Sequence, residues 1–204
     1  MRRPSWVGVI DVQNKSLNRI PISGLDEMKK FRVFHKTEYG SSASYPGVDI
    51  AMQDDSLMIA PKGINAVYIY DLSADSLSSY HFHSEITPDR QTDNPKSEVS
   101  SQEEFREISK KRTMEVRFEM PLFDPENELY YRFTKGVARE VGDGELEADY
   151  VLTVFDHKMN PLFETKDIPL NRHPGKCFVK NGLIYIFQNV NDEMGFVRFK
   201  IKEE

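Results

Sequence analysis

The sequence predicts an all-β fold, a β-propeller of four-stranded antiparallel blades with about three blades present. Three observations predict it. The same hairpin pattern occurs three times in the sequence, and its turns begin at Asp11, Asp71 and Asp156. Each of these aspartates follows an apolar or aromatic run, and a leucine begins the next run. Finally, runs such as 183–187 are apolar at every position, which is typical of strands covered on both faces.

The three aspartates are interpreted as residues that form turns rather than as catalytic groups. An aspartate at the end of a strand accepts hydrogen bonds from backbone N–H groups two residues further on. Catalysis would not need the same residue at the same place in every unit. One supersecondary unit repeated along a chain indicates a repeat architecture.

The repeating unit is a meander of four strands. From the N-terminus the sequence predicts two strands, a four-strand unit, a second four-strand unit and three strands, all within a single domain over 1–204. A two-sheet sandwich is the competing architecture, but it gives no reason for a repeated four-strand unit. The predicted blade units span roughly 1–24, 45–84, 114–170 and 175–204.

A helix interrupts this pattern between the two complete units. Residues 88–96 are polar and contain prolines, which indicates a loop. A short inserted helix follows near 101–112, with acids first, bases last and a capping box between Ser100 and Glu103. Residues 25–45 and 136–147 are predicted to be irregular.

Composition narrows the classes of function. The chain has 204 residues and a net charge of −6, which argues against a nucleic-acid partner. No apolar run is long enough for a membrane helix, and no secretory signal precedes the first predicted strand. The single cysteine, Cys177, is predicted to be a buried structural thiol.

Three segments, 127–133, 151–156 and 181–187, resemble a family of uncharacterised bacterial proteins that are exported, lipoprotein-like, six-bladed propellers of the TolB-like type. The similarity covers most of 45–204 and matches the C-terminal half of that family. It implies a partial six-bladed propeller located in the periplasm or cell envelope. No catalytic residues are established for the family, so none is carried over. The chain differs from that family in having no secretory signal and no lipobox cysteine. Its pattern is that expected of part of a longer propeller.

Two pairs of residues are candidates for a site. His81 and His83 lie at i and i+2 on one face of a predicted strand, a spacing that suits a metal. The favoured interpretation is an outer strand with solvent-facing histidines, since two ligands do not make a site. Tyr130 and Arg132 also share a strand face, and an arginine among aromatic residues can bind a carboxylate or stack on a ring. A structural role is favoured for them, because an arginine between blades often pairs with an acid or carbonyl of a neighbouring strand. The isolated His35 is predicted to be exposed.

The sequence favours a non-enzymatic binding or scaffold module of the cell envelope, with no cofactor and a protein, peptide or glycan as its ligand. Such a module should show a contiguous aromatic patch. An incomplete ring leaves faces and edges open, which suggests a homodimer through the open propeller faces. The alternative is a metal-dependent hydrolase or lactonase-like enzyme, for which the first strands offer only Asp49 and Glu119. A third possibility is that a chain of this length has no independent role.

Overall fold

A computed structural model describes residues 5–142, 144–168, 170, 174–190 and 193–201. The chain divides into two compact units, each of which is discontinuous in sequence. The first contains 1–46 and 92–112, and the second contains 47–91 and 113–204. The prediction of an all-β fold is confirmed, because the described chain forms several sheets, nearly all of them antiparallel, and few helices. No helix in the described part of the chain is long and apolar enough to cross a membrane.

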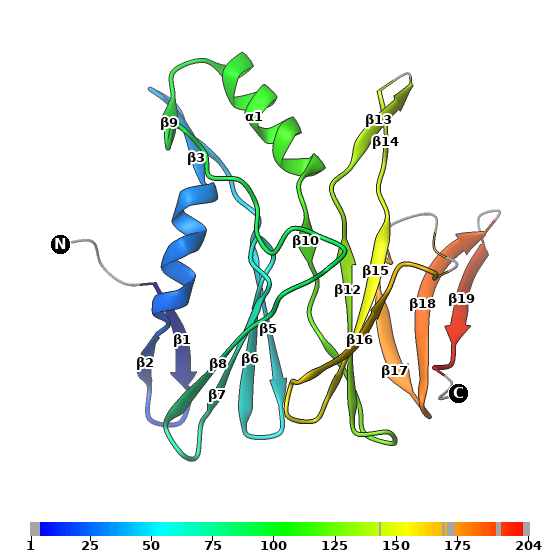
Figure 1. Cartoon of the computed structure of the whole chain (residues 1–204). Coiled ribbons are helices and arrows are strands. Elements are labelled where there is room, and N and C mark those ends of the chain that lie inside the picture. The colour runs from blue at the N-terminus through cyan, green and yellow to red at the C-terminus, as the bar shows by residue number, and fades with distance from the viewer. Residues whose placement is uncertain (1–4, 143, 169, 171–173, 191–192, 202–204) are drawn as a thin grey trace. The chain divides into compact units, whose positions relative to one another are not determined.

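The first unit combines two small sheets with two helices (Figure 1). The hairpin β1–β2 forms one sheet, and β3 pairs with β4 on one side and, in parallel, with β9 on the other. The elements are β1 (Trp6–Asp11), β2 (Ser16–Pro21), the 3₁₀ helix η1 (Ser23–Phe31), β3 (Val33–Thr37), β4 (Gly40–Ser44), β9 (Glu98–Val99) and α1 (Gln102–Met114).

The second unit contains three larger antiparallel sheets, which follow one another in chain order (Figure 1). The first sheet has the order β5-β6-β7-β8, the second β10-β12-β15-β16 with β11 also on β12, and the third β17-β18-β19. The strands of the second unit are β5 (Val48–Gln53), β6 (Ser56–Pro61), β7 (Ala66–Asp71), β8 (Ser76–His81), β10 (Arg117–Phe118), β11 (Leu122–Asp124), β12 (Leu129–Lys135), β13 (Arg139–Gly142), β14 (Glu145–Glu147), β15 (Tyr150–Asp156), β16 (Pro161–Thr165), β17 (Cys177–Lys180), β18 (Leu183–Val190) and β19 (Glu193–Phe199).

Two apolar clusters hold these three sheets together. Because successive side chains of a strand point to opposite faces, β12 contributes Tyr130 to one cluster and Tyr131 to the other. The first cluster joins Tyr130 and Phe155 to Val67 of the first sheet. The second joins Tyr131 to Ile184 of the third sheet. The middle sheet is therefore covered on both faces, as its continuous apolar strands predicted.

The repeated turns form as predicted. The carboxylate of Asp11 accepts hydrogen bonds from the backbone N–H groups of the residues two and three positions on. Asp71 does the same, and Asp156 accepts from the N–H groups two and four positions on. The Asn181-Gly182 turn has both central φ angles positive, at 52° and 64°. Local hydrogen bonding is enough to fix these hairpins.

Three local predictions were wrong. Residues 25–45 are not irregular, because they contain η1 and the hairpin β3–β4. Residues 136–147 contain the hairpin β13–β14 rather than only a loop. The α1 helix forms as expected, but its cap lies one residue later, where the Ser101 hydroxyl accepts a hydrogen bond from the Glu104 N–H at 3.1 Å. The Ser-x-x-Glu spacing occurs at both positions, so the sequence alone did not determine the register.

Candidate binding surface on the C-terminal sheet

Four aromatic side chains lie together on one face of the sheet β17–β19. We call this set, Phe178, Tyr185, Phe187 and Phe196, the aromatic face. Phe178 stacks on Tyr185 with ring centroids 4.9 Å apart and planes 4° apart. Phe196 meets Phe178 edge-on at 5.5 Å and Phe187 at 5.9 Å. Such offset and edge-on contacts are the favoured geometries of aromatic pairs.

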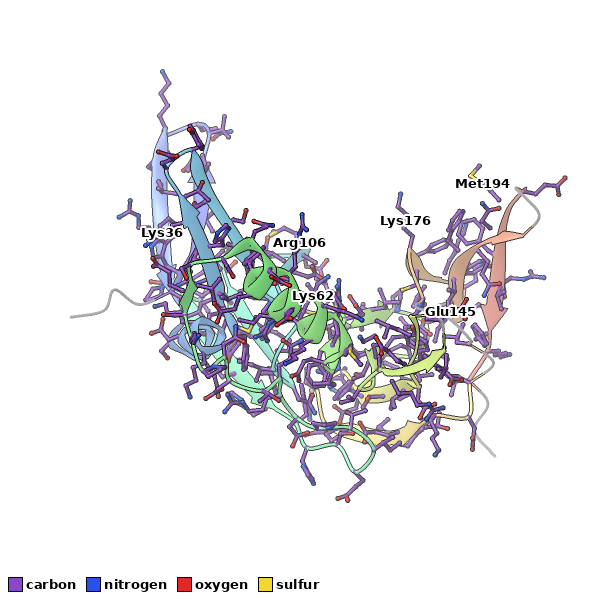
Figure 2. The ribbon with its side chains drawn as sticks, turned by 90° about the horizontal axis from the view of Figure 1, so that it is seen from above. Lys36, Lys62, Arg106, Glu145, Lys176 and Met194 are labelled. Atoms are coloured by element: carbon purple, nitrogen blue, oxygen red, sulfur yellow. The ribbon has the colours of Figure 1, made fainter. Side chains whose placement is uncertain are left out.

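Strand register explains why these rings gather. Phe178 lies opposite Tyr185, and Phe187 lies opposite Phe196. Residues directly opposite each other share a face, whereas Ile184 and the residues alternating with it point into the apolar cluster on the other side. In Figure 2, Lys176 and Met194 project from one end of this sheet.

The aromatic face is open to solvent. Phe178 is 40% exposed and Phe196 is 52% exposed. The all-apolar run 183–187 had predicted a strand buried on both sides, but the third sheet is packed against the middle sheet on one side alone among the described residues. Sequence reasoning did not name these residues as a site. The signal available was a pair of aromatic residues at alternate positions in the run 183–187, with at least one aromatic residue in each neighbouring predicted strand.

Tyr130, one of the predicted binding residues, is largely buried between the first and middle sheets. Its hydroxyl donates a hydrogen bond to Gln53 Oε1 at 3.2 Å. It also lines a pocket of about 140 Å³ with Gln53 and Asp54. Burial raises the pKa of the Tyr130 hydroxyl, so this group is a neutral donor near pH 7.

Arg132, the second predicted binding residue, is enclosed by aromatic rings rather than presented to solvent. Only 1% of it is exposed, and its guanidinium lies 5.0–5.4 Å from the ring centroids of Phe82, Phe118 and Phe155. Its Nη2 donates a hydrogen bond to Asn65 Oδ1. Burial lowers the pKa of Arg132 to about 10, against the opposing effect of nearby carboxylates. Tyr130 and Arg132 share a face, as predicted, but that face is packed against the first sheet.

The two candidate metal-binding histidines, both exposed, have different partners. The His81 ring meets Tyr68 edge-on at 5.9 Å. His83 Nδ1 lies 2.7 Å from Asp89 Oδ2, and Asp89 also accepts a hydrogen bond from Asn65. Within the described ranges no group of three or more histidine, cysteine, aspartate or glutamate side chains is arranged to hold a metal. The prediction that His35 is exposed was wrong, because it lies in β3 with 6% exposure.

The contact between His83 and Asp89 should make stability depend on pH. The hydrogen bond and charge of Asp89 raise the pKa of His83, which favours its protonated form in the folded protein. The stabilisation of the folded protein by this contact is therefore complete below the ordinary histidine pKa of about 6.5. It is lost as the pH rises through the higher pKa that His83 has in the folded state. Urea unfolding between about pH 6 and pH 8 should show wild-type stability falling relative to that of His83→Gln. Parallel pH profiles for the two proteins would contradict this.

Asp49 and Glu119, the acids considered for a metal-dependent enzyme, come together at a lysine. Lys62 Nζ lies 2.8 Å from Asp49 Oδ2 and 3.4 Å from Glu119 Oε2. Arg117 Nε donates a hydrogen bond to the second Glu119 oxygen at 2.8 Å. The charges of both carboxylates are thus compensated by basic residues of the chain itself.

Cys177 is half-buried rather than fully buried as predicted, and it packs beside the cluster between the middle and third sheets. Burial raises the pKa of its thiol to about 11, so it is protonated near neutral pH. We expect Ellman's reagent to react with native Cys177 at least roughly tenfold more slowly than with the unfolded chain, since the thiolate is the nucleophile. Equal rates at pH 8 in the absence and presence of denaturant would show that the thiol is accessible.

Comparisons with known proteins identify relatives of this fold. The family model described as "Domain of unknown function (DUF4221)" matches residues 3–166. The chain is similar to the crystal structure of a DUF4221 family member from Bacteroides vulgatus, with a TM-score of 0.59 and 15% identity. The similarity covers 95% of this chain and 55% of the other, so the chain spans about half the length of that protein. A search of curated proteins found no match.

Proposed function

Because the chain belongs to the DUF4221 family, a family of domains of unknown function, we propose that it is a non-enzymatic binding or scaffold module. In this proposal the three sheets of the second unit are blades of a TolB-like, six-bladed propeller, and the protein acts at the bacterial cell envelope. The order of the sheets and the apolar clusters between them support the blade arrangement.

The aromatic face carries this proposal. Contiguous exposed apolar patches mark interaction sites, and aromatic residues are enriched at protein interfaces. Of the ligands considered, a protein surface fits best. The four rings offer one polar group, the hydroxyl of Tyr185, whereas a glycan or a polar peptide would need several hydrogen-bonding partners.

The partner we propose for this face is a second copy of the chain. The opposite face of the same sheet already packs on a neighbouring sheet, so sheet-on-sheet packing is the mode of contact that the fold uses. Two aromatic faces meeting about a two-fold axis would cover one another. The protein would then be a homodimer through its open faces.

Sedimentation across a range of protein concentrations tests this contact. We expect the wild type to sediment as a dimer, and Phe196→Glu to sediment as a monomer because it places a charge in the contact. Lys158→Glu is the matched control, since Lys158 is an exposed residue in the turn between β15 and β16, outside the third sheet. A soluble wild-type monomer at high concentration would refute the dimer.

The alternative of a metal-dependent hydrolase receives less support. It would require several carboxylates to converge on a cation, whereas Asp49 and Glu119 converge on the ammonium of Lys62. Replacing Lys62 with methionine should remove the cation paired with Asp49 and leave Glu119 with Arg117 as its cationic partner. We expect a loss of about 1–2 kcal/mol in the free energy of unfolding, measured by urea titration.

A matched variant separates this loss from the loss of side-chain packing. Lys62→Arg retains the positive charge and should preserve most of the stability. If Lys62→Met is as stable as the wild type, the ion pairs do not stabilise the fold.

A further inference from the structure

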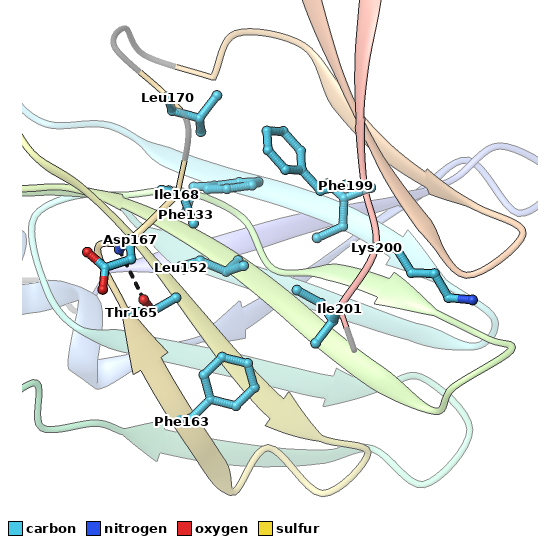
Figure 3. Close-up of a pocket in the computed structure, with 11 residues that line it drawn as sticks. Phe133, Leu152, Phe163, Thr165, Asp167, Ile168, Leu170, Phe199, Lys200 and Ile201 are labelled. Atoms are coloured by element: carbon cyan, nitrogen blue, oxygen red, sulfur yellow. Dashed lines mark hydrogen bonds between the residues drawn. The ribbon is translucent and has the colours of Figure 1, made fainter. Parts of the chain in front are cut away.

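A cavity of about 270 Å³ lies between the middle and third sheets (Figure 3). Apolar side chains from both sheets form most of its lining. Leu152 and Phe163 come from β15 and β16, and Phe199 and Ile201 from the end of β19 and the residues after it. Phe133, Leu152 and Ile184 also belong to the apolar cluster between the sheets, so the cavity continues an established interface.

The cavity lies where a fourth strand of the third sheet would pack. In the middle sheet, β16 is the outermost strand, and its Phe163 lies opposite Val154 on the face that is turned toward the third sheet. The first and middle sheets each continue to a fourth strand in their order, whereas the described part of the third sheet ends at β19. Within the described residues, no fourth strand of that sheet is therefore placed opposite β16.

The outer edge of β19 presents backbone groups for pairing. The Phe187 N–H donates to the carbonyl of Lys176, on the β17 side of β18. Phe187 and its partner Phe196 therefore form a non-hydrogen-bonded pair between β18 and β19. It follows that the backbone N–H and C=O of Phe196, and of Arg198 two residues on, point away from β18 toward the open edge.

We propose that this edge and the cavity together form a site for strand addition, in which an extended peptide segment pairs with β19. Backbone hydrogen bonds would supply the affinity, and alternate apolar side chains of the peptide would enter the cavity and supply the specificity. An apolar cavity of about 150 Å³ holds a benzene ring, so this one has room for a phenylalanine side chain or two aliphatic ones. The site uses the backbone edge of β19 and the inner face of the sheet, whereas the aromatic face consists of side chains on the outer face.

A peptide that copies residues 159–166 of the chain is a suitable probe. It contains the sequence of β16. In the middle sheet β16 is the fourth strand and pairs with β15, and a fourth strand of the third sheet would pair with β19 in the same way. NMR titration of the whole protein should show saturable shifts of the Phe196 and Arg198 amides, together with slower hydrogen exchange. A scrambled peptide should cause neither.

Two matched pairs of variants test the two parts of the site. Phe163→Glu places a charge in the cavity, whereas Leu162→Glu places the same charge at the exposed adjacent residue, which does not line the cavity. Arg198→Pro removes an outward N–H, whereas Arg198→Thr retains it. We expect Phe163→Glu and Arg198→Pro to weaken peptide binding by about tenfold or more, and each control by less than about threefold. Thermal melts verify that each variant is folded.

The results expected for peptide binding at β19 can be distinguished from those expected for contacts at the aromatic face. Absence of saturable shifts on β19 at millimolar peptide, or binding unchanged by both Phe163→Glu and Arg198→Pro, would overturn strand addition. Shifts confined to Phe178 and Tyr185 would also overturn it, because they would place the peptide on the aromatic face. The dimer, tested by sedimentation of Phe196→Glu, stands or fails separately.

Discussion

Replacing Arg132 with alanine is expected to lower the free energy of unfolding by about 3 kcal/mol or more. The side chain fills the space between Phe82, Phe118 and Phe155, and it donates to Asn65. Its removal leaves a void among the rings and a buried acceptor without its donor. Urea unfolding at neutral pH, compared with the wild type, measures the loss.

Arg132→Met separates packing from charge. Methionine fills much of the same volume without a buried cation, and apolar replacements of buried ionic groups are often neutral or stabilising. The Nε and Nη1 atoms of Arg132 are buried without a hydrogen-bond partner among the described residues, so the charge is incompletely solvated. We expect Arg132→Met to lie within about 1 kcal/mol of the wild type. Equal large losses in both variants would show instead that the guanidinium itself stabilises the fold.

Replacing Asp124 with alanine should cost about 2–4 kcal/mol of unfolding free energy. Asp124 is fully buried and accepts three hydrogen bonds. The donors are the Glu126 N–H at 3.1 Å, Asn127 Nδ2 at 2.7 Å and the Tyr131 hydroxyl at 3.1 Å. The substitution therefore removes the acceptors of the turn between β11 and β12 and of a buried phenol.

Titration of Tyr131 provides a second measurement. Burial, followed by the charge and hydrogen bond of Asp124, raises the pKa of Tyr131 to about 12. In a folded Asp124→Ala variant the ultraviolet titration should show this pKa lowered, though still above its ordinary value because burial remains. Asp124→Asn retains one acceptor for the backbone and should lose less stability. An unchanged Tyr131 titration in the alanine variant would contradict the contact.

The hairpins could be predicted because their determinants are local. Asp11, Asp71 and Asp156 each bond to backbone groups within four residues, so the sequence of the turn contains the whole interaction. The Asn181-Gly182 turn was predicted on the same basis, since both residues tolerate positive φ. The shared face of Tyr130 and Arg132 also followed from the two-residue period of a strand.

The errors arose where the determinants are distant or the periodicity was overlooked. Leu25, Met28 and Phe31 are the buried residues of η1, and their spacing of three matches the 3₁₀ helix, so this signal was present in the sequence. The strand β3 has no such local signal, because its parallel partner β9 lies more than sixty residues later, with Phe34 opposite Glu98.

The candidate surface depends on which sheet faces are covered, and alternation of residue types does not determine this. Residues 183–187 of β18 are apolar on both faces, and β12 also carries large aromatic residues on both of its faces. Among the described residues, β12 is packed on both sides, whereas β18 carries the aromatic face on one of them. Likewise, the strand pattern put Arg132 on a common face with Tyr130, but only the neighbouring sheet shows that the face is closed.

The interleaving of the two units in sequence has a consequence for biosynthesis. The first unit needs both 1–46 and 92–112. The second unit consists of 47–91, which lies between those two segments, and of 113–204, which follows them. A nascent chain released up to residue 91 would therefore hold a complete β5–β8 sheet but would lack β9, the parallel partner of β3. No single cut in the chain frees one unit intact from the other. Genetic dissection of this protein should therefore excise a unit with its connection rejoined, rather than truncate from either terminus.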